Sequence, residues 1–233
     1  MNNKETLLLK ISGASLKAKN DIIDFDFIKN IARQIKLMTE KFKIAIVLGG
    51  GNIWRGKTSD ASIERYKADQ MGMLATMINS LAMESIFQSY GIKTKIYSTI
   101  DMDKIANNYV IKDLLQSLQN NEVIILACGT GRPYFTTDTG TAVSAAEIKA
   151  NFILMGKNNV DGVYSKDPHV HSDAVFYPKL TYERALSENL GVMDSSAVSI
   201  CKENGIKTIV FKINEPNSII NALTMKSKRT IIE

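Results

Sequence analysis

Short runs of aliphatic and β-branched residues alternate along the chain with longer segments that have the period of an amphipathic helix. This alternation is typical of a parallel sheet whose strands are joined by helices packed on its two faces. The expected strands are Thr6–Ile11, Lys43–Leu48, Lys93–Tyr97, Val123–Cys128, Phe152–Met155 and Lys207–Phe211. The predicted fold class is therefore α/β, a three-layer α/β/α sandwich with a mainly parallel central sheet.

The segments between these runs predict the helices. They are Asp24–Lys41, Asp69–Tyr90, Asp103–Gln119, Thr139–Lys149 and Ser195–Asn204. Apolar residues recur at the spacing of one helix face in the first segment, and Gly205 follows the last one, where glycine commonly ends a helix. No repeat, low-complexity tract or linker divides the 233 residues, so we expect a single domain over 1–233.

Composition and charge exclude several classes of protein. With 45% hydrophobic and 23% charged residues, the chain is not of the disordered type, and its most apolar run, Val123–Cys128, is strand-sized. Two cysteines and an N-terminus without the layout of a signal peptide predict a cytoplasmic location. The formal charge of +5 comes from scattered lysines without interleaved aromatic residues. We therefore expect neither nucleic acid nor a membrane as a partner.

Glycines follow four of the expected strands, at the edge where parallel strands end. They stand in Ser12-Gly13, Gly49-Gly50-Gly51, Gly129-Thr130-Gly131 and Asp161-Gly162. Ligands of such sheets bind beyond the carboxyl ends of the strands, and glycine lets backbone N–H groups approach phosphate oxygens. One glycine turn is weak support, but its recurrence at one edge predicts a phosphorylated ligand.

Residues 51–58, GNIWRGKT, satisfy the P-loop pattern G-x-x-x-x-G-K-[ST] after an apolar run. A P-loop NTPase also needs a strand that ends in an aspartate to hold Mg²⁺, and none of the expected strands ends that way. The residues after Thr58, SDASIERY, would also make a poor apolar helix against the sheet. A P-loop NTPase that uses Gly51–Thr58 is therefore kept only as an alternative.

Two charged residues stand out near this edge. Lys10 interrupts the apolar run LLLKISG, where an ammonium is costly unless it reaches a ligand or solvent at the strand end. Asp138 is the carboxylate of the hydroxyl-rich segment GTGRPYFTTDT. Either Asp138 or Thr137 could instead simply cap the helix that Thr139 opens.

Six segments together resemble bacterial UMP kinases, which are members of the amino acid kinase family. They are LLLKISG, IVLGGGNIWRGKT, ADQMGMLATMINSLA, GTGRPYFTTDT, NNVDGVYSKDP and VMDSSA, in the family's order and approximate spacing. The resemblance implies the amino acid kinase fold and transfer of the γ-phosphoryl group of ATP to UMP in pyrimidine nucleotide biosynthesis. It also implies Mg²⁺ carried mainly by the nucleotide phosphates, without a metal site on the protein. Another enzyme of the family, acting on a carboxylate or carbamate, is the alternative.

The resemblance also assigns residues to roles. The implied catalytic residues are Lys10, Arg55, Asp138 and Asp194. The implied ATP-binding residues are Lys10, Ile11, Ser12, Gly13, Gly51, Arg55, Asn158, Tyr164 and Asp167. The implied UMP-binding residues are Gly50, Asp69, Thr130, Gly131, Arg132, Pro133, Tyr134, Phe135, Thr136 and Thr137. The UMP side would thus lie mainly in the N-terminal two-thirds of the chain and the ATP side mainly in 150–233.

The chemistry of phosphoryl transfer fits these residues. The UMP phosphate has a second pKa near 6 and is mostly deprotonated at pH 7, so no general base is needed. This agrees with His169 and His171 lying outside the glycine loops, as expected surface residues. Lys10 and Arg55 would offset the charge of the transferred group, while Asp138 would orient Lys10 or hold Mg²⁺.

Assembly and regulation follow only from the resemblance. It implies a homohexamer and a possible UTP feedback inhibitor. Met71, Met73, Met77 and Met83 could line a subunit contact but are predicted to face the core. Where many relatives carry an acidic residue and flexible glycines after Ser-Gly, this chain has Ala14 and KAKNDIID. That segment is associated with GTP activation in the family, so the resemblance does not support GTP activation here.

Overall fold

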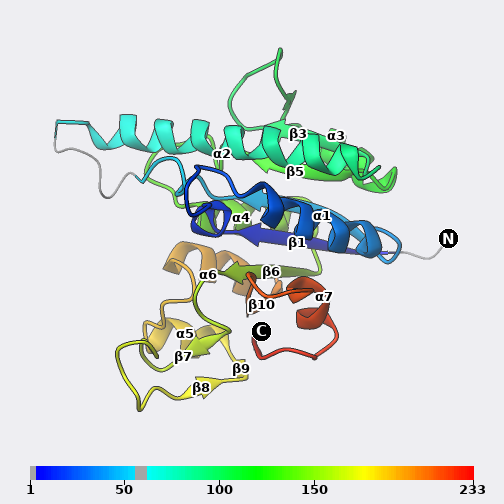
Figure 1. Cartoon of the computed structure of the whole chain (residues 1–233). Coiled ribbons are helices and arrows are strands. Elements are labelled where there is room, and N and C mark those ends of the chain that lie inside the picture. The colour runs from blue at the N-terminus through cyan, green and yellow to red at the C-terminus, as the bar shows by residue number, and fades with distance from the viewer. Residues whose placement is uncertain (1–3, 56–61) are drawn as a thin grey trace.

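A long central sheet organises the computed structural model, which describes residues 4–55 and 62–233 (Figure 1). The strand order is β4-β3-β5-β2-β1-β6-β10-β11-β9. The bounds are β1 Glu5–Ile11, β2 Phe42–Leu48, β3 Thr94–Ser98, β4 Asn107–Asn108, β5 Val123–Ala127, β6 Phe152–Lys157, β9 Lys179–Leu180, β10 Lys207–Lys212 and β11 Arg229–Ile232. Within this nine-stranded sheet, as the described residues show it, the strand pairs are parallel except β10–β11. The six strands expected from the sequence are all present.

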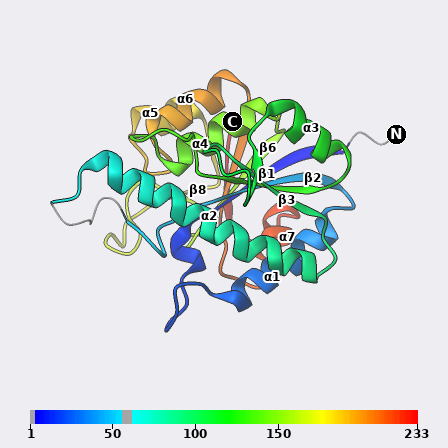
Figure 2. The same cartoon turned by 90° about the horizontal axis from the view of Figure 1, so that it is seen from above.

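Helices cover both faces of the sheet, as Figure 2 shows. Seen from above, α3, α4, α5 and α6 lie on one side and α1, α2 and α7 on the other. Their bounds are α1 Phe25–Met38, α2 Arg65–Ser89, α3 Ile111–Gln119, α4 Thr137–Glu147, α5 Tyr182–Ser187, α6 Ser195–Glu203 and α7 Ser218–Leu223. A short 3₁₀ helix, η1 Gly13–Leu16, follows β1, and β7 Val163–Tyr164 pairs with β8 Phe176–Tyr177 apart from the main sheet. The three-layer sandwich is confirmed.

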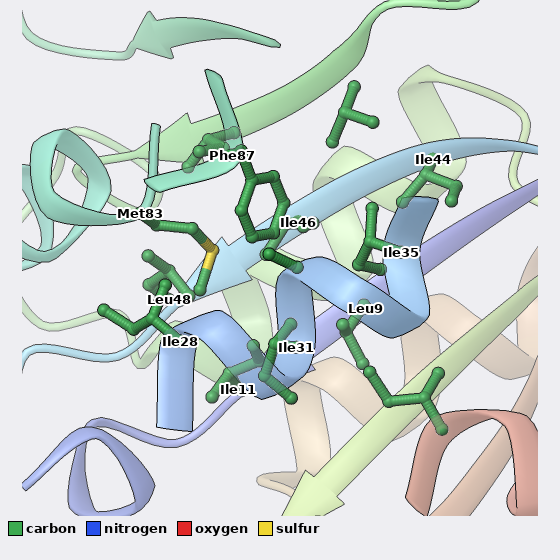
Figure 3. Close-up of a cluster of buried hydrophobic side chains, with 14 of the residues drawn as sticks. Leu9, Ile11, Ile28, Ile31, Ile35, Ile44, Ile46, Leu48, Met83 and Phe87 are labelled. Atoms are coloured by element: carbon green, nitrogen blue, oxygen red, sulfur yellow. The ribbon is translucent and has the colours of Figure 1, made fainter. Parts of the chain in front are cut away.

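Alternation along β1 sorts its side chains between two cores. Leu9 and Ile11 pack with residues of α1 and α2, such as Ile35 and Phe87, in the cluster drawn in Figure 3. Leu8 belongs to the other cluster, which includes residues of α3, α4, α5 and α6. Burial of each such aliphatic side chain is worth about 1.5–3 kcal/mol. Because successive strand residues point to opposite faces, Lys10 shares the face of Leu8.

The predicted helix at Asp103–Gln119 is wrong in its first half. Residues 107–108 form strand β4 beside Tyr97–Ser98, and helix α3 begins only at Ile111. The side-chain amide of Asn107 also donates to the Ile96 carbonyl at 2.9 Å. Asparagine is a weak helix former, so edge pairing outweighs the local helical pattern here.

Two other helices begin earlier than expected, and the methionine prediction is only partly right. Helix α2 starts at Arg65 rather than Asp69. Helix α4 starts at Thr137, and its first turn is capped by the hydroxyl of Thr136, which accepts from the Thr139 N–H at 3.1 Å. Neither Asp138 nor Thr137 is the cap. On α2, Met73, Met77 and Met83 are buried, but Met71 is exposed.

Candidate active site

The first two glycine loops touch each other, backbone against backbone. The Gly49 N–H donates to the Ile11 carbonyl at 2.9 Å. A Cβ on Gly13 would lie 2.2 Å from the Gly51 nitrogen, and one on Gly49 would lie 2.7 Å from the Gly13 nitrogen. These glycines are therefore required for the loops to pack, whatever they bind. Their packing keeps two backbone segments together at the carboxyl edge of the sheet.

Lys10 and Asp138 form an ion pair at this edge. The Lys10 Nζ lies 2.7 Å from Oδ1 of Asp138, and Lys10 is only 8% exposed. Lys10 comes from the end of β1, whereas Asp138 lies in the first turn of α4. The positive end of the α4 dipole adds to the attraction for an anion at this point. The ion pair places Asp138 where it could orient Lys10, and its role, orienting Lys10 or holding Mg²⁺, stays a prediction.

Asp194 joins the beginnings of two helices. It caps α6 by accepting from the Ala197 N–H at 3.0 Å, and it accepts from the hydroxyls of Thr136 and Thr139 at the start of α4. Burial raises the pKa of Asp194, but these hydrogen bonds outweigh burial and hold the pKa below its usual value. This geometry gives Asp194 a positioning function, so direct participation in catalysis stays a prediction.

A first cavity, of about 300 Å³, lies between the second glycine loop, the start of α2 and the loop before α4. The implied UMP-binding residues that line it are Gly50, Asp69, Thr130, Arg132, Phe135, Thr136 and Thr137. Gly51, assigned to the ATP side, also lines this cavity, whereas Gly131, Pro133 and Tyr134 are not among the residues that form its wall. We refer to this space as the first cavity.

Asp69 connects α2 to the loop over this cavity. Its Oδ2 lies 2.9 Å from Nε of Arg65, one turn earlier, and accepts from the Tyr134 N–H at 2.8 Å. Tyr134 has a φ of +73° and its side chain is exposed. Gly131 has a φ of +70°, and a Cβ there would lie 2.8 Å from the Thr99 carbonyl oxygen. A positive φ costs energy at a residue with a side chain, such as Tyr134, and strain of this kind is often found at binding sites.

A second cavity, of about 480 Å³, lies beyond the end of β6. Tyr164 and Asp167, which the resemblance assigns to ATP, line it together with apolar residues such as Leu190 and Val210. Asn158 is not in its wall and instead accepts a hydrogen bond from Asn214. Polar residues such as Asn159 and His169 also line this cavity, and the apolar part of the wall suits a flat heterocycle. We refer to this space as the second cavity.

The polar residues of the second cavity are held by their neighbours. The Tyr164 hydroxyl donates to Asp161 at 2.6 Å and accepts from Lys228 at 2.8 Å. Oδ1 of Asp167 accepts from the His169 N–H at 2.9 Å. His169 is exposed, as expected, but it also lines the cavity, which the sequence did not indicate.

Several site residues were not identified from the sequence. Arg65 and Trp54 line the first cavity. The buried side chains of Asn52 and Asn79 exchange two hydrogen bonds, of 2.9 and 2.8 Å, and the Asn79 amide also donates to the Gly49 carbonyl at 2.8 Å. The spacing of Arg65 and Asp69 on a helix could have indicated their ion pair. No sequence signal distinguishes Asn79 from a surface asparagine.

The P-loop hypothesis finds no support in the described residues. Gly56, Lys57 and Thr58 of the motif lie outside them. Helix α2 begins only at Arg65, whereas the helix of a P-loop follows the motif directly. The Arg55 Nε donates to the Gly51 carbonyl at 2.9 Å, which closes a local turn.

The donor groups of the site fit a magnesium ion that arrives with phosphates. Asp138 supplies one carboxylate at the Lys10 end, and no group of three or more His, Cys, Asp or Glu side chains within residues 4–55 and 62–233 could enclose a metal. Mg²⁺ commonly binds through one or two carboxylates together with substrate phosphates.

Within residues 4–55 and 62–233, no helix combines the length and apolar character that a membrane crossing requires.

Comparison with known proteins identifies the family of this chain. The model of the amino acid kinase family matches residues 5–212, and the chain belongs to that family. It is 60% identical over 231 residues to a uridylate kinase of Malacoplasma penetrans (strain HF-2), covering 99% of this chain and 73% of that protein. The crystal structure of UMP kinase from Ureaplasma parvum superposes with a TM-score of 0.96 at 43% identity, covering 99% of both chains. That of UMP kinase from Bacillus anthracis gives 0.92 at 29% identity, covering 98% and 96%.

Proposed function

We propose that this chain is a UMP kinase, which transfers the γ-phosphoryl group of ATP to UMP and releases UDP and ADP in pyrimidine nucleotide biosynthesis. The observation that carries the proposal is the Lys10–Asp138 ion pair at the sheet edge that both cavities adjoin. The full-length similarity to uridylate kinases favours UMP as the acceptor.

In this proposal UMP occupies the first cavity. The Asp69 carboxylate accepts hydrogen bonds from the ribose hydroxyls, and the loop Thr130–Thr137 surrounds the nucleotide. The start of α4 then faces the UMP phosphate, where backbone N–H groups and the helix dipole favour negative charge. Because that phosphate is already deprotonated at neutral pH, the site needs to position the nucleophile rather than remove a proton.

ATP occupies the second cavity in the proposal, with its adenosine against Tyr164 and Asp167 and its phosphates toward Lys10. The Lys10 ammonium offsets charge on the transferred group, Asp138 holds that ammonium in place, and Arg55 assists from the second glycine loop. Mg²⁺, held mainly by the phosphates with Asp138 as the protein carboxylate at this point, would neutralise further negative charge. The chain forms one domain over 1–233, with the ATP side mainly in 150–233.

The proposal includes a homohexamer in the cytoplasm, with UTP as a feedback inhibitor. An exposed apolar stripe on α2, made of Met71, Leu74, Ile78 and Leu81 at 39–49% exposure, supports subunit contacts. UTP shares uracil and ribose with UMP, so it could compete at the first cavity.

A coupled assay for ADP release tests the function. UMP, CMP, dTMP, glutamate and acetylglutamate are offered in turn as acceptors, with ATP and Mg²⁺ present throughout. We expect the largest kcat/KM with UMP. A preference for glutamate or acetylglutamate would support the alternative within the family, and ATP hydrolysis that is independent of every acceptor would contradict the proposal.

A further inference from the structure

A third lysine lies close to the ion pair, although neither the sequence nor the family resemblance singled it out. Lys157 is the last residue of β6, the strand beside β1. Lys10 is paired with Met155, two residues before Lys157. Paired residues of parallel strands share a face, and so do residues two apart on one strand. Lys10 and Lys157 therefore project from the same face, which α4 and α6 cover.

The Lys157 ammonium has a neutral partner in a partly buried place. Its Nζ donates a hydrogen bond to the Val192 carbonyl oxygen at 2.5 Å, and within residues 4–55 and 62–233 this is its one hydrogen bond. An ammonium carries three donors, and one carbonyl does not neutralise its charge. Burial lowers the pKa of Lys157, nearby Asp138 raises it, and Lys10 lowers it further. Asp138, already paired with Lys10, thus compensates Lys157 only in part.

Lys157 also lines the second cavity, together with Val192. Its ammonium therefore lies between the cavity proposed for the adenosine and the Lys10–Asp138 pair proposed for the transferred group. A group linking those two places must pass the end of β6. In a nucleoside triphosphate that linking group is the phosphate chain, and its anionic oxygens are suitable acceptors for a lysine ammonium.

We propose that Lys157 binds the phosphate chain of the nucleoside triphosphate, exchanging the Val192 carbonyl for phosphate oxygens while Lys10 contacts the transferred group. This inference rests on the proposed function for its choice of ligand. The bond to Val192 is then the resting position of the side chain, and the ammonium turns toward the cavity when the triphosphate arrives. Lys157 contributes to affinity for phosphates and not to the shape of the heterocycle pocket.

Binding measured by calorimetry with AMP and with a non-hydrolysable imido analogue of ATP separates these contributions. Lys157→Met keeps a chain of similar length without the charge. We expect it to weaken the triphosphate analogue about tenfold or more, as loss of a charge-assisted hydrogen bond would, and AMP less than about twofold. Lys157→Arg restores the charge and should recover most of the affinity. The matched control is Lys207→Met. Lys207 is an exposed lysine at the start of β10 that pairs with Glu233, whereas Lys157 lies beside the end of that strand, so both affinities should be unchanged.

Each other outcome contradicts the inference. An equal loss for AMP and the triphosphate analogue would mean that Lys157 only shapes the cavity, and unchanged affinity for both would mean that it contacts neither. If the wild-type protein binds the triphosphate analogue but phosphorylates no UMP, the proposed function fails while the calorimetric contrast still decides the role of Lys157. In the acceptor assay, Lys157→Met should raise KM for ATP and leave KM for UMP within about twofold.

Discussion

The two cavities at the carboxyl edge of the sheet are built in different ways. In the first, the main charged group is already paired, because Asp69 is bound by Arg65 and by the backbone N–H of Tyr134. The surrounding loops are fixed to α2 through buried polar side chains. In the second, apolar and polar residues both line the wall, and within the described residues the Lys157 ammonium donates its hydrogen bond to a neutral carbonyl, that of Val192.

This difference predicts how each cavity responds to mutation. A polar network that holds loops in place contributes to folding as well as to binding, so its loss should change stability and affinity together. A charged side chain that awaits its ligand contributes little to folding, and its loss should change affinity alone. Under the proposed function, the first cavity is thus a site formed in advance, and the second would be completed by the phosphates of its nucleotide.

The largest effect is expected at Lys10, on the carboxyl edge of the sheet that both cavities adjoin. In the proposed mechanism the Lys10 ammonium offsets charge on the transferred group, so Lys10→Ala should lower kcat by about 10²-fold or more. Steady-state kinetics with ATP and UMP measures this, and thermal melting shows whether the variant is folded. Lys207→Ala, at the opposite edge of the sheet, serves as the control. A Lys10→Ala enzyme with near-normal kcat would remove the basis of the proposed mechanism.

The buried amide pair behind the first cavity should affect stability most. Asn79→Ala leaves Asn52 and the Gly49 carbonyl without their partner, which should lower the free energy of unfolding by about 2–3 kcal/mol and raise KM for UMP. Denaturant unfolding gives the first value. Asn204→Ala removes an exposed amide and should cost less than about 0.5 kcal/mol. Equal effects of the two substitutions would show that the amide pair does not support the loop.

Asp69→Asn should change KM for UMP but not KM for ATP. The amide can still accept from the Tyr134 N–H, but it loses the charge that pairs with Arg65 and that, in the proposed function, attracts the ribose hydroxyls. We expect KM for UMP to rise about tenfold, which corresponds to about 1.4 kcal/mol, with KM for ATP within about twofold. Steady-state kinetics with each substrate varied in turn checks this. A rise in KM for ATP alone would reverse the assignment of the two cavities.

The smallest effect is expected from Lys57→Ala, in the segment with the P-loop pattern. In the proposed enzyme Lys57 is not assigned to the phosphates, so kcat should fall by less than about fivefold. In a P-loop NTPase the same lysine contacts the β- and γ-phosphates, and its loss would remove a main electrostatic stabiliser, at about 10²-fold or more in kcat. The acceptor assay with UMP distinguishes the two.

The sequence predicted the parts of this molecule that depend on local pattern. Periodicity located the six main strands, and the unusual lysine in LLLKISG indicated Lys10 before any geometry was known. The pairing of Lys10 with Asp138 lies between residues far apart in the chain, and only the family resemblance linked them. The first half of the helix expected at Asp103–Gln119 failed because β4 gains an edge pairing that local propensity does not contain.

Other parts of the site could not have been predicted from one sequence. Asn79 is identified as part of a polar network only by its burial against Asn52. Lys157 looks like any strand-end lysine until the register beside β1 places it on the face of Lys10. The expected helix caps Thr137 and Asp138 lie one and two residues beyond the true cap, Thr136, and that small shift is what leaves Asp138 available to Lys10.

A crystal structure with UMP and the imido analogue of ATP bound together tests the central claim most directly. We predict UMP in the cavity lined by Asp69 and the triphosphate in the cavity lined by Tyr164, with the two phosphate ends meeting beside the Lys10 ammonium. Both nucleotides in one cavity, or phosphate ends that meet away from Lys10 and Asp138, would contradict this account of the site.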